Sequence, residues 1–208
     1  IKYINFKLIN KNLLDTSMNF LLTGGAGYIG SHAALSLLDA GHSVHIIDDL
    51  STGNKSLIPK NAFFTKCNIN NEEVISKLIQ SNNFDVLMHF AGFIQVEESV
   101  KYPQKYFDNN TENATKLFET CKRNGLNKIV FSSTAAAYGS VSGNILIDEN
   151  TKLNPKNPYA ESKIKTENFL FNNKDDYKFI ILRYFNVAGA DKKLRSGQIS
   201  KRSTHLIK

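Results

Sequence analysis

Short apolar runs alternate with amphipathic segments along most of the chain. The runs are apolar along nearly their whole length, which is typical of strands covered by helices on both faces. They lie at residues 18–24, 43–49, 62–67, 84–90, 128–133 and 178–185. Between them, apolar positions recur at helical spacing in residues 29–41, 71–82, 109–125 and 158–171. This order predicts an α/β fold with a doubly wound parallel sheet.

The fold is expected to begin at Met18, directly before the first predicted strand. Residues 1–17 mix short apolar groups with Lys and Asn, so we interpret them as an extension outside the fold. They lack the continuous apolar core of a signal peptide, and no run in the chain reaches the roughly 18 apolar residues that span a bilayer. Residues 18–190 are predicted to form one main domain, followed by the polar, basic residues 191–208.

Composition narrows the class of protein. With 208 residues, 41% of them hydrophobic, the chain can bury a core, which excludes global disorder. Cys67 and Cys121 have no cysteine nearby in sequence, so we interpret them as structural thiols in a reducing compartment, the cytoplasm, and predict no metal site. The net charge of +7 raises nucleic-acid binding as an alternative, but the lysines are scattered, which favours a solvated basic surface.

A glycine-rich turn follows the first predicted strand. The stretch TGGAGYIGSH carries Gly24, Gly27 and Gly30 and opens the first predicted helix. Such glycines permit a tight turn and close approach of a pyrophosphate to the helix N-terminus. Asp48 ends the second strand, where an acid can accept from both hydroxyls of an adenosine ribose and repel the extra phosphate of NADP. The combination predicts a Rossmann domain that binds NAD.

A tyrosine and a lysine four residues apart begin the last predicted helix. A lysine one turn from a tyrosine can favour the phenolate, and so make Tyr159 a base with Lys163 as its activator. Taken alone, such a pair is more often a solvated helix face. Ser132, Ser133 and Thr134 leave the preceding strand at the edge where a parallel sheet binds its ligand, and one of them can bond the reacting oxygen.

His89 ends the fourth predicted strand, followed by the small residues of HFAG. We interpret it as a packed histidine rather than a catalyst.

Six motifs occur in the order and at about the spacing of one enzyme family. They are TGGAGYIGSH, DDLSTG, HFAG with ESV and YFDNN after it, SSTAAAYG, NPYAESK and LRYFNVAGA. Together they resemble the extended short-chain dehydrogenase/reductases, most closely the UDP-glucose 4-epimerase branch, over residues 18–207.

The resemblance implies a set of site residues. Those implied to contact NAD are Gly24, Gly27, Tyr28, Ile29, Gly30, Asp48, Asp49, Leu50, Ser51, Thr52, Gly53, Asn68, Ile69, Phe90, Ala91, Gly92, Asn109, Tyr159, Lys163 and Phe185. Tyr159, Lys163 and Thr134 match the catalytic residues, and Thr134, Tyr159, Asn186 and His205, the last within residues 204–207, match positions near the nucleotide sugar.

The implied reaction interconverts UDP-glucose and UDP-galactose. In that family, NAD takes a hydride from sugar carbon 4, the 4-keto sugar turns over, and the hydride returns to its other face. The resemblance also implies a homodimer through residues 109–125 and 158–171.

The chain departs from the family pattern at several positions. Asn68 stands where an acid is usual, Ile94 where some members have a lysine, and Glu97 where a glycine is common. Ala135 and Ala136 follow Thr134 where dehydratases carry an acid, which favours an epimerase.

Family members continue well past Lys208, so we expect residues 191–208 to be the start of a truncated substrate-binding region. The alternatives are therefore an NAD-binding remnant without turnover, or another extended short-chain enzyme that acts on nucleotide sugars.

Overall fold

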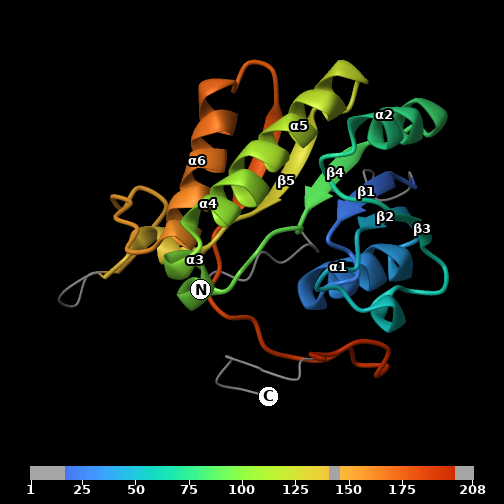
Figure 1. The fold of residues 1–208 in the computed structure, drawn as a ribbon. Coiled ribbons are helices and arrows are strands. Elements are labelled where there is room, and N and C mark those ends of the chain that lie inside the picture. The colour runs from blue at the N-terminus through green and yellow to red at the C-terminus, as the bar shows by residue number, and fades with distance from the viewer. Residues whose placement is uncertain (1–16, 141–145, 200–208) are drawn as a thin grey trace.

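One parallel sheet forms the centre of the molecule (Figure 1). The computed structural model describes residues 17–140 and 146–199. The strands are β1 (Asn19–Thr23), β2 (Ser43–Asp48), β3 (Phe63–Lys66), β4 (Val86–His89), β5 (Lys128–Ser132) and β6 (Lys178–Leu182). They lie in the order β3-β2-β1-β4-β5-β6, and all neighbouring pairs are parallel. The doubly wound sheet predicted from the sequence is confirmed.

The predicted helices are present, with one difference. They are α1 (Tyr28–Asp39), α2 (Glu72–Ser81), α5 (Ala114–Arg123) and α6 (Pro158–Asn172). The segment before α5, expected to be α-helical, is a π-helix, η4 (Phe107–Asn113). Four short elements were not predicted: α3 (Val96–Lys101), α4 (Pro103–Tyr106) and the 3-10 turns η3 (Lys55–Leu57) and η5 (Ala135–Tyr138).

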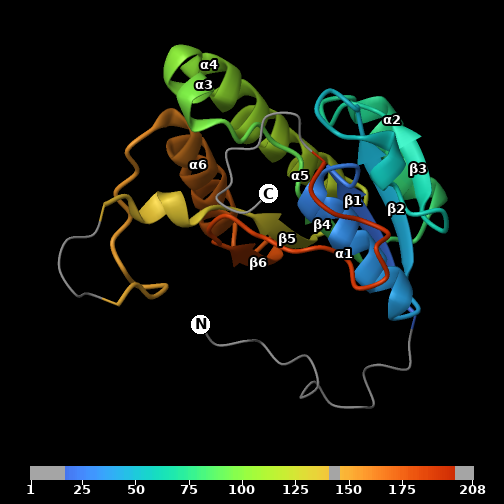
Figure 2. The same ribbon diagram turned by 90° about the horizontal axis from the view of Figure 1, so that it is seen from below.

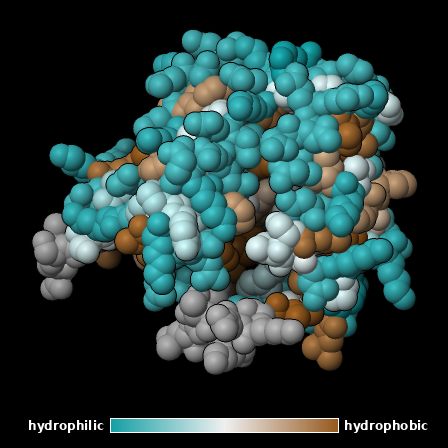
Figure 3. Space-filling model, viewed as in Figure 1, coloured by the Kyte–Doolittle hydropathy of each residue, from teal (hydrophilic) through white to brown (hydrophobic). Residues whose placement is uncertain are grey.

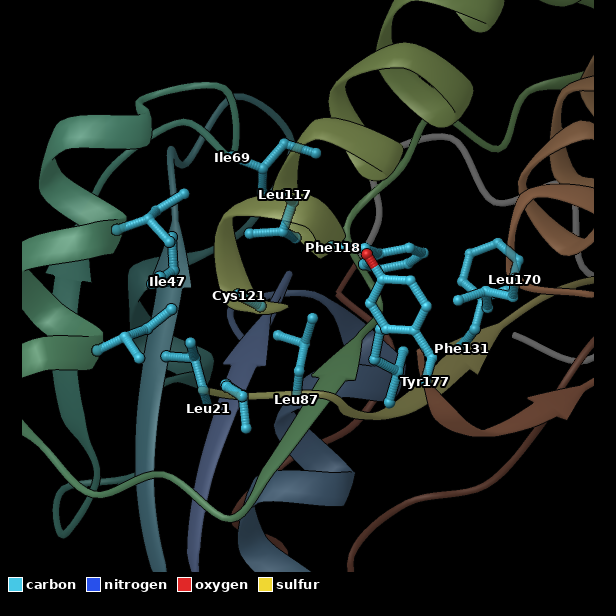
Figure 4. Packing of buried hydrophobic residues seen from close by; sticks show 14 of the residues in the cluster. Leu21, Ile47, Ile69, Leu87, Leu117, Phe118, Cys121, Phe131, Leu170 and Tyr177 are labelled. Atoms are coloured by element: carbon cyan, nitrogen blue, oxygen red, sulfur yellow. The ribbon is translucent and has the colours of Figure 1, made fainter. Parts of the chain in front are cut away.

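The two faces of the sheet bury separate apolar clusters, because successive strand residues point to opposite sides. Leu22 of β1 packs with Ala34 of α1 on one face, whereas its neighbour Leu21 belongs to the cluster on the other. That second cluster also contains residues of α2, α5 and α6, and Figures 1 and 2 show α1 on the opposite side of the sheet. Figure 4 shows Phe118 and Cys121 of α5 facing the strands. Each fully buried side chain of this kind contributes about 1.5–3 kcal/mol.

Residues after β6 return to α1. The Tyr28 hydroxyl donates to the Gly189 carbonyl over 2.6 Å, and the hydroxyls of Ser31 and Ser196 are 2.8 Å apart. Arg195 also forms an ion pair of 2.7 Å with Asp39 at the end of α1. Figure 1 shows this segment running below α1, and Figure 2, seen from below, shows it passing across α1. The beginning of the predicted substrate-binding region therefore packs on the first helix of the sheet, while residues 1–16 and 200–208 lie outside the described residues.

The surface seen in Figure 3 is mostly hydrophilic, with scattered apolar patches. Within residues 17–140 and 146–199, no helix is both long and apolar enough to cross a membrane.

The chain order in the sheet reverses between β1 and β4. From β1 the sheet grows outward to β2 and β3 on one side, and to β4, β5 and β6 on the other. Ligands of doubly wound sheets bind outside the carboxyl ends of the strands at such a reversal. Near this reversal, β1 ends at Thr23, β4 at His89 and β5 at Ser132. Predicted site residues follow each of these strand ends.

Candidate active site

The glycine turn packs closely against the end of β4. Gly24 has φ of +72°, and a Cβ there would lie 2.5 Å from the Ala91 backbone nitrogen. A Cβ on Gly30 would lie 2.3 Å from the Gly24 carbonyl oxygen, so α1 can approach the turn only without a side chain at position 30. Gly27 is the N-cap of α1 and offers no side-chain cap to the first amides, those of Tyr28 and its neighbours. This arrangement fits a pyrophosphate, since the turn is close and the helix N-terminus is uncapped.

Asp48 lies buried at the end of β2 and holds the same turn. One carboxylate oxygen accepts from the Ala26 amide and the other from the Leu50 amide, each over 2.9 Å. Burial raises the pKa of Asp48, while these two hydrogen bonds oppose the rise. A Cβ at Gly53 would lie 2.7 Å from this carboxylate, so the DDLSTG loop folds around it. Asp48 is thus placed where an acid for the adenosine ribose was predicted, and each oxygen keeps a free lone pair.

Asn68 pairs with Asp49, the acid that directly follows β2. Its amide nitrogen donates to Asp49 over 2.8 Å, and its oxygen accepts from the Asn70 amide over 3.1 Å. Burial raises the pKa of Asp49, but hydrogen bonds from Ser51 and Asn68 bring it below its ordinary value. An acid at position 68 would face another carboxylate, which gives a physical reason for the neutral amide there.

Tyr159 and Lys163 lie one turn apart at the start of α6. The helix begins there because the Asn157 side chain accepts from the Ala160 amide over 2.9 Å, and Pro158 occupies the first turn. Lys163 is 3% exposed, so the pair is not on a solvated face. Its ammonium donates to the Ser132 carbonyl over 3.0 Å.

The charge of Lys163 is held in an apolar setting. Its nitrogen lies 5.0 Å from the centroid of the Phe131 ring. Burial lowers the pKa of Lys163 to about 8, and the charge of Glu167 opposes that fall. A Cβ on Gly92 would lie 3.2 Å from the ammonium. The backbone of Ala91 packs against Gly24 of the glycine turn, and its neighbour Gly92 lies next to the Lys163 ammonium. The HFAG stretch, residues 89–92, therefore lies between the proposed cofactor site and the lysine.

The three hydroxyl side chains at the end of β5 and directly after it bond to different partners. Ser132 bonds to the Tyr184 hydroxyl and Ser133 donates to Glu167. Thr134 caps η5 by accepting from the Ala136 amide over 3.1 Å. Burial raises the pKa of Tyr159, while a hydrogen bond with Thr134 lowers it. Of the three, Thr134 is therefore the hydroxyl beside the tyrosine.

Asn110, which the motif reasoning missed, ties three elements of this region together. Its side-chain oxygen accepts from the Phe93 amide over 2.8 Å, and its nitrogen donates to the Phe93 carbonyl over 2.9 Å and to Ser162 over 3.2 Å. Its neighbour Asn109, a predicted cofactor contact, donates to it over 3.0 Å. The asparagine-rich sequence of η4 was the available signal, because Asn is a weak helix former.

The other predicted residues differ in exposure. Ile69 is 7% exposed and packs in the core. Phe185 is 76% exposed, and Asn186 is also on the surface. Ile94, which stands where some family members have a lysine, is 61% exposed. His205 lies outside the described residues.

His89 is a packed residue, as predicted. One ring nitrogen lies 2.6 Å from the Thr23 hydroxyl, and the ring stacks on Phe131. Burial, with a smaller effect of Lys163, lowers the pKa of His89 to about 3, so the ring is neutral.

The sheet order and the glycine turn define a Rossmann protein of the dinucleotide-binding class. The chain belongs to the NAD dependent epimerase/dehydratase family, whose model matches residues 20–208.

Individual relatives share this region. A UDP-glucose 4-epimerase from Azospirillum brasilense is 45% identical over 194 residues, which cover 92% of this chain and 56% of that protein. UDP-arabinose 4-epimerase 1 from Arabidopsis thaliana is 39% identical over 190 residues, covering 86% of this chain and 45% of that protein. The crystal structure of UDP-glucose 4-epimerase from Brucella ovis in complex with NAD matches with a TM-score of 0.86 and 33% identity, over 91% of this chain and 58% of that one. The chain thus spans about half the length of these relatives.

Proposed function

We propose that this chain carries the NAD-binding domain and the proton-transfer residues of a UDP-sugar 4-epimerase. The observation that carries the proposal is a pair of contacts at the strand edge that also holds the glycine turn: Tyr159 bonds to Thr134, and the ammonium of Lys163, one turn later on α6, lies beside Gly92. The names of the relatives support a UDP-sugar as the substrate. Galactose metabolism and the UDP-glucose/UDP-galactose pair are the specific assignment that we put forward.

Tyr159 is the proposed base for the sugar hydroxyl at carbon 4. Thr134 shares the hydrogen bond of the reacting oxygen, and the buried ammonium of Lys163 favours the phenolate by its charge. When bound, NAD supplies the hydride acceptor, which leaves a 4-keto sugar to be reduced from its other face. The residues of this chain hold and move the proton, and HFAG keeps the lysine next to the cofactor turn.

The cofactor contacts are assigned to the turn and to Asp48. The first amides of α1 would bind the pyrophosphate, and the free lone pairs of Asp48 would accept from the ribose hydroxyls. Asn68, fixed by Asp49 and the Asn70 amide, would present its oxygen to the adenine amine.

The proposed division of the chain follows from this assignment. Residues 18–190 form the NAD-binding domain, and residues 191–208 begin the substrate-binding region. The buried free thiols of Cys67 and Cys121 support a reducing compartment, and we propose the cytoplasm. We also propose a homodimer through residues 109–125 and 158–171, which sedimentation of the purified chain would refute by showing monomer alone.

A second candidate function is NAD binding without turnover. The chain spans 56% of the length of the Azospirillum brasilense relative, so turnover by this chain alone is a proposal separate from NAD binding. Closure over a substrate can supply several kcal/mol of a barrier, so a chain of this extent can hold its catalytic residues in place and still be inactive.

Hydride transfer from UDP-galactose separates these candidates. The chain is incubated with NAD and UDP-galactose, and reduced nicotinamide is followed by its near-ultraviolet absorbance while UDP-glucose is measured by chromatography. Reduction that disappears in Tyr159→Phe, but not in the matched control Tyr102→Phe at an exposed tyrosine, supports the epimerase assignment. NAD binding with neither signal supports the second candidate, and reduction that persists in Tyr159→Phe refutes the role of that tyrosine.

A further inference from the structure

A fully buried acid lies behind the candidate site. Glu167 is 0% exposed and stands one helical turn after Lys163 on α6. Its carboxylate accepts from the Ser133 hydroxyl and forms two hydrogen bonds, of 3.0 and 3.1 Å, with Nε of Arg183. Arg183 reaches it from the end of β6 and also donates to the Tyr138 hydroxyl over 3.0 Å. Burial of a carboxylate is costly unless it is paired in this way.

Lys163 has few polar neighbours of its own. Apart from the Ser132 carbonyl, its ammonium faces the Phe131 ring and the neutral His89 behind that ring. Tyr159 lies on the same helix, one turn before it.

The other titratable groups nearby surround Tyr159 and Glu167 rather than the ammonium. Tyr106 of α4 packs edge-on against Tyr159 at 6.4 Å, and Tyr184 interacts electrostatically with Tyr159. Arg183 is paired with Glu167. Among these groups, Glu167 supplies the negative charge that acts on the lysine.

We propose that Glu167 is a positioning residue of the candidate site: its carboxylate keeps the Lys163 ammonium charged and, through Ser133, directs the end of β5 so that Thr134 faces Tyr159. The proposal deepens the proposed function and rests on it for the catalytic meaning of Lys163. Neither effect requires contact with a substrate or a cofactor.

The charge effect follows from helix geometry. Residues four apart on a helix lie on one face, so Glu167 and Lys163 share the buried side of α6. An opposite charge stabilises the protonated amine against desolvation, which acts in the other direction. Nε and Nη2 of Arg183 both donate to the Glu167 carboxylate and hold it in place.

The orienting effect follows from the different hydrogen-bond partners of the hydroxyls of Ser132, Ser133 and Thr134. Glu167 takes the hydroxyl of Ser133, and Ser132 bonds to Tyr184. Thr134 is then the hydroxyl left beside Tyr159.

The charge of Lys163 can be measured without NAD or sugar. The full chain is labelled with carbon-13 at lysine Cε, and the Lys163 signal, identified by its loss in Lys163→Arg, is titrated by NMR. The wild-type midpoint is expected near the value of about 8 set by burial and Glu167. Glu167→Gln removes the charge at nearly constant shape and is expected to lower the midpoint by about one pH unit. Glu167→Asp keeps the charge but shortens the side chain, and its midpoint should stay near wild type.

A purely structural role predicts the reverse order, because Asp disturbs the packing more than the isosteric Gln does. Ser133→Ala is the matched control, since it removes a partner of Glu167 without changing its charge, and its midpoint should not move. If Glu167→Gln does not fold, the double variant Glu167→Gln/Arg183→Gln removes both members of the ion pair, and the midpoint should fall by less than about one pH unit, because the positive charge of Arg183 is lost with the carboxylate.

A midpoint unchanged by Glu167→Gln, or by the double variant, overturns the proposal. Its failure is distinguishable from failure of the proposed function, because NAD binding by the wild-type chain is measured separately by calorimetry.

Discussion

Replacing Lys163 with methionine is expected to stabilise the folded chain near neutral pH. The lysine is 3% exposed, and burial lowers its pKa from 10.5 to about 8. One pH unit of pKa difference corresponds to about 1.4 kcal/mol, so the charged lysine costs the folded state about 3 kcal/mol at pH 7. Methionine keeps the length of the side chain but leaves the Ser132 carbonyl without its donor, which costs about 1–3 kcal/mol. The expected net gain in the free energy of unfolding is therefore up to about 2 kcal/mol.

The gain should depend on pH with a defined sign. The pKa of Lys163 is lower in the folded state, so between about 8 and 10.5 the unfolded wild type holds more protons than the folded protein. The free energy of unfolding of the wild type therefore rises over this range, and the advantage of Lys163→Met shrinks.

Urea unfolding followed by circular dichroism tests this, since the chain contains no tryptophan. Lys165→Met, at an exposed lysine of the same helix, is the control and should change stability by less than about 1 kcal/mol with no added pH dependence. If Lys163→Met is less stable than wild type by the same amount at pH 7 and near pH 10, Lys163 is not a desolvated charge and the reasoning fails.

Three further substitutions test the cofactor turn. Gly24→Ala would place a Cβ 2.5 Å from the Ala91 nitrogen at φ of +72°. The free energy of unfolding in urea should therefore fall by about 1–3 kcal/mol, and calorimetry should detect no NAD binding. NAD binding that remains intact would contradict the tight turn. Asp48→Asn leaves one of two backbone amides without its acceptor, so the free energy of unfolding in the same urea assay should fall by about 1–3 kcal/mol. In calorimetry, the difference in affinity between NAD and NADP should become smaller. Asn68→Asp sets a second carboxylate beside Asp49, so the melting temperature should fall at low salt and recover at high salt; no dependence on salt would argue against the pairing.

The strand pattern and the order of the elements could be predicted because both follow from local sequence. Continuous apolar runs such as 43–49 indicate strands covered on both faces, and the strand observed there is Ser43–Asp48. Tyr159 and Lys163 were placed together by helical spacing, and α6 confirms that they lie one turn apart on it.

Other features depend on contacts between distant residues and have no local signal. From the sequence alone, Glu167 is interpreted as a surface residue of an amphipathic helix and Arg183 as the polar end of a strand. In the fold they form a buried ion pair. The hydrogen bonds of Asn110 to Phe93 and Ser162 likewise join residues that are far apart in the sequence.

Calorimetric titration of the chain with NAD tests the central claim most directly. The account predicts saturable binding at one site, weaker binding of NADP, and loss of both in Gly24→Ala, because the glycine turn and Asp48 form the cofactor site. Absence of NAD binding by the folded wild-type chain, or equal binding by Gly24→Ala, would contradict it.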